Sequence, residues 1–147
     1  MQQKQSEFKE KVLDLRRVTR VMACGKRMRF RATVVIGNEK GRIGIGVGKG
    51  LDVAQSVDKA KTSAKKNLIE IKLKNKTIPH EVDAKFSAAR ILIKPAKSGH
   101  GLKAGGSART VLLLAGVRDA TAKCLGGTKN KLTNALATLE ALKKIKI

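Results

Sequence analysis

Tryptophan and tyrosine are absent from this 147-residue chain, and phenylalanine occurs only three times, as Phe8, Phe30 and Phe86. Proteins that bind single-stranded nucleic acids usually stack the bases on aromatic side chains. This chain has almost none to offer. Any nucleic acid that it binds must therefore be held through backbone charge and shape, which is how folded RNA is mostly recognised.

A long apolar run is also missing, so we expect no membrane-spanning helix, and the first residues lack the apolar stretch of a signal peptide. The two cysteines, Cys24 and Cys124, form no CxxC pair, and with His80 and His100 they match no zinc-binding spacing. We therefore expect a cytoplasmic protein with free thiols and with no membrane contact, metal or cofactor.

Acidic residues are scarce: 11 of them stand against 33 lysines and arginines, which gives a formal net charge of +22. Residues 1–74 hold 19 basic and 7 acidic residues, and residues 75–147 hold 14 and 4, so the imbalance is not confined to one tail. Such a surface repels itself unless a polyanion neutralises it, and nucleic acid is the obvious polyanion. A membrane surface fits less well, because no helix gathers its basic residues opposite a broad apolar face.

The first half of the chain predicts an α-β-β-β-α unit. Residues 6–15 place apolar side chains on one helical stripe and predict a short helix. Residues 16–36 alternate in strand fashion about a central glycine and predict a hairpin. A third strand over residues 41–50 leads into an amphipathic helix over residues 51–71, which Asp52 is able to cap.

The second half predicts short strands, a glycine-rich basic loop over residues 97–109, a short apolar helix that ends at Gly116, and a final helix over residues 128–146. We accordingly expect an α+β fold. It divides into an N-terminal domain over residues 8–71 and a small two-layer α/β domain over residues 72–147.

The third strand, GRIGIGVGKG, contains five glycines but satisfies neither the dinucleotide fingerprint nor the Walker loop. Its apolar residues, from Ile43 to Val47, alternate with glycines, so one face of the strand carries no side chains. Glycine inside a strand often marks a close backbone approach. RNA, the second domain or a packed helix could lie there. The failed motifs and the few carboxylates argue against an enzyme.

Four segments occur in a familiar order over roughly residues 8–142: RVTRV before a Gly-Lys-Arg hairpin, GRIGIGVGKG before a helix, KPAKSGHGLKAGG, and LLLAGVRDATAKCLGG. Together they resemble the family of the fifth protein of the bacterial small ribosomal subunit. The resemblance implies a first domain like a double-stranded-RNA-binding fold and no catalytic activity. It implies a structural role that includes rRNA binding, subunit assembly and decoding accuracy near the mRNA entry channel. The implied neighbours are the fourth and eighth proteins of that subunit.

A freestanding double-stranded-RNA-binding protein or RNA chaperone is the alternative, although it would leave the basic second half of the chain unexplained. A solvated strand edge could account for the basic hairpin, but such edges usually mix both signs.

We predict RNA contacts from the basic hairpin, the third strand and the outer face of the helix that follows. These residues are Arg16, Arg17, Arg20, Gly25, Lys26, Arg27, Arg29, Arg31, Lys49, Lys59, Lys65 and Lys66. The family resemblance further implies that the glycine-rich loop lies toward the fourth protein. That prediction concerns Gly99, Gly101, Lys103 and Arg109.

Overall fold

The computed structural model describes residues 8–71, 73 and 76–145, which form two four-stranded sheets and three helices. The first sheet has the strand order β1-β2-β3-β4, and the second has the order β5-β6-β8-β7. The elements are β1 (Lys9–Met22), β2 (Gly25–Gly37), β3 (Arg42–Gly50), α1 (Val53–Lys66), β4 (Leu68–Glu70), β5 (Val82–Phe86), β6 (Ala89–Pro95), β7 (Leu102–Lys103), α2 (Gly106–Ala115), β8 (Ala120–Cys124) and α3 (Lys131–Lys143).

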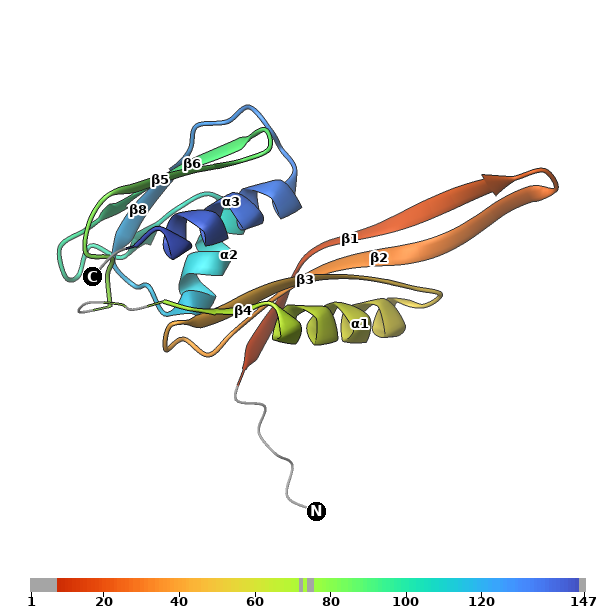
Figure 1. Cartoon of the computed structure of the whole chain (residues 1–147), viewed down its shortest axis with the longest axis horizontal. Helices are drawn as coiled ribbons and strands as arrows, with labels where there is room; N and C mark the ends of the chain where they lie inside the picture. The colour runs from red at the N-terminus through yellow and green to blue at the C-terminus, as the bar shows by residue number, and fades with distance from the viewer. Residues whose placement is uncertain (1–7, 72, 74–75, 146–147) are drawn as a thin grey trace, which may run out of the picture.

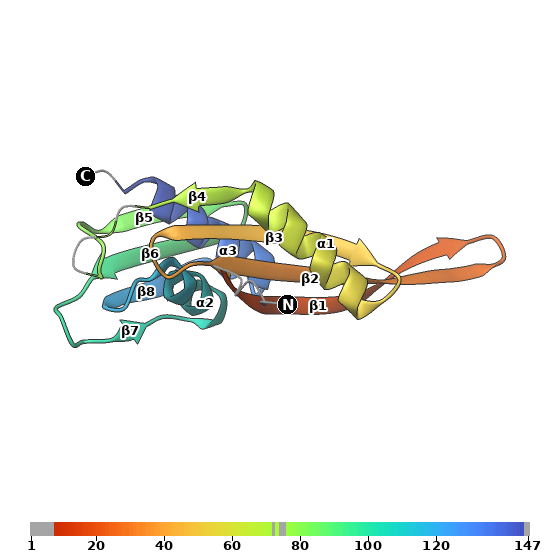
Figure 2. The same cartoon turned by 90° about the horizontal axis from the view of Figure 1, so that it is seen from below.

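Strands β1 and β2 form the predicted hairpin and extend well past the rest of their sheet (Figure 1). Strand β2 pairs with β3 only from Phe30 to Gly37. The stretch before Phe30 pairs with β1 alone. Residues 18–29 therefore form a two-stranded arm, and Figures 1 and 2 show it projecting beyond the body.

The helix predicted over residues 6–15 is wrong: residues 9–15 belong to strand β1 and pair with the apolar part of β2. A register shift between Val12 and Asp14 interrupts the alternation of this strand. Because of this bulge, apolar and polar residues do not alternate regularly along the strand, so the sequence pattern does not indicate a strand. Pairing with β2 outweighs the helical spacing of the apolar residues in this segment. Residues 6 and 7 lie outside the described residues. The α+β class, with a strand-rich first unit and an α/β second unit, is confirmed.

Helix α1 is what lies against the bare face of β3 (Figure 2). A Cβ atom on Gly46 would collide with the backbone nitrogen of Ala64 and with the carbonyl oxygen of Ala60. Both alanines are fully buried against the even-numbered residues of β2. Of the three alternatives, a packed helix is therefore the occupant, and the RNA and second-domain alternatives for this face are wrong. The predicted cap is present, because the Asp52 carboxylate accepts a hydrogen bond from the backbone of Val53.

The opposite face of the first sheet packs on the second unit. Val35, Ile43 and Ile45 belong to one continuous core with residues of α2, α3 and the second sheet. The backbone joins the units as well: the Glu39 N–H donates to the Leu114 carbonyl at 3.0 Å, and the turn between β2 and β3 thereby covers the last turn of α2. The first sheet thus lies between α1 and the second unit.

The second unit follows its sequence pattern closely. Helix α2 ends at Gly116, whose φ of 95° is the left-handed value that a glycine C-cap adopts, as predicted. Helix α3 begins after Asn130, whose side chain accepts a hydrogen bond from Leu132 N–H at 3.1 Å. Among the helices described, none is long and apolar enough to cross a membrane.

Candidate nucleic-acid interface

The arm and its base carry seven cations with no acidic residue between Leu15 and Arg31. Those cations are Arg16, Arg17, Arg20, Lys26, Arg27, Arg29 and Arg31. Of these, only Arg16 has an ion-pair partner in the described part of the chain, the Asp14 carboxylate at 2.6 Å. Six positive charges of this segment are therefore unneutralised.

The strand register sorts these cations by face. Residues directly opposite each other in an antiparallel pair share a face. Arg20 lies opposite Arg27, and Arg31 lies opposite both Arg16 in β1 and Lys49 in β3. Arg29 falls on the same side, opposite Val18. We call this side, defined by Arg16, Arg20, Arg27, Arg29, Arg31 and Lys49, the arginine face.

Like charges placed directly opposite in a ladder destabilise it. The arginine face does this twice, in the pair Arg20–Arg27 and in the row that joins Arg16, Arg31 and Lys49. It also contains a hollow of about 310 Å³. The apolar side chains of Val18 and Met22 line this hollow together with four cations of the arginine face, Arg20, Arg27, Arg29 and Lys49. Such an arrangement suits an anionic partner that neutralises the charges and touches the apolar side chains between them.

The carboxylates of the molecule are engaged elsewhere. Those with ion-pair partners away from the arm pair as Lys9–Glu39, Arg42–Glu70, Lys61–Glu10, Lys61–Asp58, Arg90–Asp83, Lys94–Glu81 and Lys143–Glu140. The hydrogen bond that Arg90 donates to Asp83 lowers the pKa of that carboxyl below its ordinary value. The hydrogen bond that Lys61 donates to Glu10 raises the pKa of Lys61. These carboxylates thus pair with cations outside the arm, and both the arm and the rest of the molecule keep an excess of positive charge.

Two family models match the chain: "Ribosomal protein S5, N-terminal domain" over residues 8–72 and "Ribosomal protein S5, C-terminal domain" over residues 84–147. The chain belongs to the ribosomal protein S5 family. It is 49% identical over 141 residues to the small ribosomal subunit protein uS5 of Thermosynechococcus vestitus, covering 95% of this chain and 80% of the relative. It is 45% identical to uS5 of Campylobacter jejuni subsp. jejuni, with 95% of each chain covered. It is 46% identical to uS5c of Cyanophora paradoxa, with 97% of this chain and 85% of that one covered.

The predicted resemblance is confirmed, and with it the place of this S5-family chain among small-subunit ribosomal proteins rather than enzymes. Within the described residues, no group of three or more histidine, cysteine or acidic side chains is arranged to hold a metal. Cys24 is exposed in the turn of the arm, and Cys124 is partly buried in the second unit.

The structure does not bring all the predicted RNA-contact residues together. Lys59, Lys65 and Lys66 are exposed on α1, which covers the side of the sheet opposite the arginine face. Arg17 and Lys26 also lie on the α1 side of the arm. They pair with Phe30 and Val21, and these pairs alternate along the ladder with the pairs of the arginine face. Gly25, with a φ of 137°, begins β2 directly after the turn of the arm and pairs with Met22. The predicted set is thus divided between two faces.

The glycine-rich loop of this S5-family chain belongs to the second unit. Gly99 and Gly101 have φ values of 86° and 77°, and the Gly101 N–H donates to the Asp119 carboxylate at 2.9 Å. Lys103 in β7 and Arg109 in α2 are exposed. The loop residues therefore form a second surface. It lies on the second unit, at the end of the molecule opposite the tip of the arm in Figure 1.

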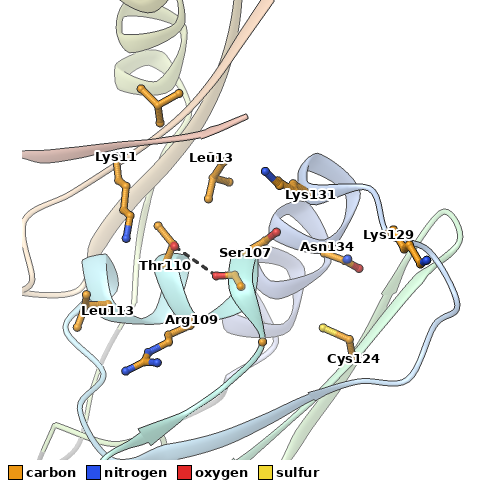
Figure 3. A pocket seen from close by; sticks show the side chains of 13 residues that line it. Lys11, Leu13, Ser107, Arg109, Thr110, Leu113, Cys124, Lys129, Lys131 and Asn134 are labelled. Atoms are coloured by element: carbon orange, nitrogen blue, oxygen red, sulfur yellow. Dashed lines mark hydrogen bonds between the residues drawn. The ribbon is translucent and has the colours of Figure 1, made fainter. Parts of the chain in front are cut away.

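Sequence reasoning missed one basic cleft altogether. It is a hollow of about 740 Å³ between β1 and the beginnings of α2 and α3, and Lys11, Lys129 and Lys131 line it (Figure 3). Lys11 is far from Lys129 and Lys131 in the sequence, so no local pattern could join it to them. The available signal was the beginning of a helix near Ser107, which the chain pattern does indicate.

Proposed function

We propose that this chain binds the rRNA of the small ribosomal subunit through the arginine face of its arm. The observation that supports this most strongly is that cations without an ion-pair partner in the described residues lie directly opposite each other on this face, as the pairs Arg20–Arg27 and Arg31–Lys49. Guanidinium groups donate in a fork geometry that matches phosphate oxygens, so a row of arginines suits a phosphate backbone.

Binding through this face rests on charge and shape. The chain has no tryptophan or tyrosine on which bases could stack. Val18 and Met22 offer apolar contacts in the hollow between the arginines. A folded RNA with closely spaced phosphates therefore suits the arm better than an unstructured strand does.

A salt titration tests this function directly. The full chain is titrated onto a folded small-subunit rRNA fragment at several salt concentrations. The slope of log K against log salt should be about −0.7 to −0.9 for each phosphate neutralised, so several contacts give a steep line. A flat salt response, or tighter binding to an unstructured strand than to the folded fragment, would refute the proposal.

We further propose the finer role that the family resemblance implies: support of subunit assembly and of decoding accuracy near the mRNA entry channel, beside the fourth and eighth proteins of the subunit. In this proposal the glycine-rich loop lies toward the fourth protein, and the domains span residues 8–71 and 72–147. The family membership supports it over a freestanding RNA chaperone. Sedimentation of cell extract is the test: the chain should migrate with small subunits after a moderate salt wash, whereas a chaperone should not.

A further inference from the structure

One acidic residue, Asp14, lies at the base of the arginine face. It pairs with Thr33 of β2 and precedes Arg16 by two residues in β1, so its side chain shares a face with that arginine. The Asp14 Oδ2 accepts a hydrogen bond from Arg16 Nε at 2.6 Å, and Oδ1 lies 3.7 Å from Lys131 Nζ at the beginning of α3. In the described part of the chain, no other carboxylate pairs with a cation of the arginine face.

The bulge of β1 determines on which face Asp14 and the residues after it stand. Before the bulge, Val12 pairs on the side of the sheet that α1 covers. The ladder then skips Leu13, which packs against the core shared with the second unit, and resumes with Asp14 on the side of that unit. A shift of one residue moves every later side chain to the other face. Without the bulge, Arg16 and Arg20 would stand on the α1 side.

The carboxylate of Asp14 is held more firmly than an ordinary surface group. Only 18% of this side chain is exposed, against 59% for Arg16 and 56% for Lys131. An ion pair between two exposed and flexible side chains contributes little. Here one mostly buried carboxylate, directly after the bulge, contacts cations from both units. It ties the base of the arm to α3 at the point where the strands leave the body.

The bond to Asp14 leaves most of the Arg16 guanidinium free for a phosphate. A guanidinium has five N–H donors in a fixed geometry, and the carboxylate accepts from Nε. The two terminal amino groups remain available, and the bond at Nε sets their plane. A negative charge at this point weakens the attraction of the arginine face for RNA. Any contribution of Asp14 to binding must therefore come from orientation.

We propose that Asp14 is a positioning residue for rRNA binding, which holds the guanidinium of Arg16 in place at the base of the arginine face. It acts through Arg16 and makes no contact with the RNA itself. The inference rests on the proposed rRNA binding and adds to it the residue that aligns the first cation of the face.

The sign of the effect of one substitution tests this role. Asp14→Asn keeps the size of the side chain and removes its charge. Charge alone would make the variant bind the folded rRNA fragment more tightly than the unsubstituted chain. We expect weaker binding instead, by about fivefold to eightfold at about 0.1 M salt, with a salt slope smaller by about 0.7 to 0.9, as for one lost phosphate contact. Tighter binding with an unchanged slope would overturn the proposal.

Glu10→Gln is the matched control. Glu10 lies in the same strand before the bulge, on the α1 side, and pairs with Lys61 at 2.8 Å. This substitution also removes one negative charge and an ion pair, but it should leave the slope unchanged and the binding no weaker. An equal loss of binding in Glu10→Gln would assign the effect to a general loosening of β1 and would overturn the proposal.

A double substitution shows whether Asp14 acts through Arg16. In a chain that already carries Arg16→Gln, the addition of Asp14→Asn should weaken binding no further, because the group that the carboxylate holds is gone. A further loss as large as that in the unsubstituted background would contradict the route through Arg16.

The free protein gives a readout that needs no RNA. The NMR signal of the Arg16 Nε–H, assigned by its loss in Arg16→Lys, should exchange with water more slowly in the unsubstituted chain than in Asp14→Asn. Equal exchange rates would overturn the positioning. If the unsubstituted chain does not bind the rRNA at all, the proposed function fails and this inference falls with it. If that chain binds and Asp14→Asn binds more tightly, the inference alone is overturned.

Discussion

Strand β2 has two halves that behave in opposite ways. Residues 32–37 are all buried, between α1 on one face and the second unit on the other, whereas residues 25–29 are all exposed. The backbone conformation and the partner strand β1 are the same throughout. The halves differ because β3 pairs only from Phe30 onward, so the outer half has neither a third strand nor a layer to cover it.

The comparison shows what holds each half in place. A two-stranded ribbon is marginal by itself in water, and the arm adds opposed arginines to that disadvantage. The arm is anchored because its strands continue into the buried half. The buried half supplies the stability, and the outer half carries the charge that the proposed function needs.

The largest effect should come from filling the bare face of the buried half. Gly46→Val forces a side chain into the backbone of α1, where no rotamer change can relieve the collision. We expect a loss of roughly 3 kcal/mol or more in the free energy of unfolding, measured by chemical denaturation. Gly127→Ala is the control, because a Cβ there meets nothing within 4 Å. A Gly46→Val protein of ordinary stability would mean that α1 does not pack as described.

The next effect concerns the two faces of the arm. The pair Arg20→Gln and Arg27→Gln removes two charges from the arginine face, and Arg17→Gln with Lys26→Gln removes two from the other face. Both should change the stability by no more than about 0.5 kcal/mol, because all four side chains are exposed. Only the first pair should reduce the salt slope of rRNA binding, by about 1.5. Equal losses from both pairs would show that total charge matters and that the face does not.

A smaller effect is expected far from the arm, at Arg109. This exposed arginine of α2 belongs to the proposed contact with the fourth protein. Arg109→Leu should leave incorporation into subunits unchanged and raise stop-codon readthrough. A shift of about 1.4 kcal/mol between two states of such a contact changes their ratio tenfold. Normal accuracy in cells whose subunits contain the variant would leave the loop without a role in decoding.

The smallest effect concerns an ion pair of the second sheet. Arg90 donates to the Asp83 carboxylate at 2.6 and 3.0 Å and lowers its pKa below the ordinary 3.8. Because the folded-state pKa is lowered, the pair stabilises the fold above about pH 4, and the contribution disappears as the pH falls through the folded-state pKa. Asp83→Asn should therefore lower Tm slightly at pH 7 and not at all at the acid end.

The control for this pair is Glu70→Gln, whose partner Arg42 is 3.3 Å away and whose side chain is 73% exposed. Its Tm difference at pH 7 should be smaller than that of Asp83→Asn. A difference for Asp83→Asn that persists unchanged below pH 3 would mean that the carboxylate acts through packing and not through charge.

Local signals in the sequence predicted the parts of the fold that local chemistry decides. Asp52 caps α1, Gly116 ends α2 in the left-handed conformation, and the hairpin turns before Gly25. The first part of β1, residues 9–15, could not be predicted, because the bulge after Val12 interrupts its alternation and its partner is the distant strand β2.

The candidate site was predictable only in part. The run of arginines is visible in the sequence. Its division into two faces depends on the register between β1 and β2, and a slip of one residue would move each side chain of a strand to the other face. The occupant of the bare β3 face and the gathering of Lys11 with Lys129 depend on how distant segments pack. The residues next to Ala60 and Lys11 in the sequence do not predict which distant residues these two contact.

The joint between the units also has a mechanical consequence. The turn after β2 is fastened to the end of α2 by the hydrogen bonds from Glu39 and Gly41 to Leu114 and Ala115, both at 3.0 Å, and a shared core lies behind them. Closely packed interiors are stiff and transmit strain. The strands from which the arm extends and the helix that follows the glycine-rich loop therefore belong to one packed body, so a displacement of α2 would strain the base of the arm.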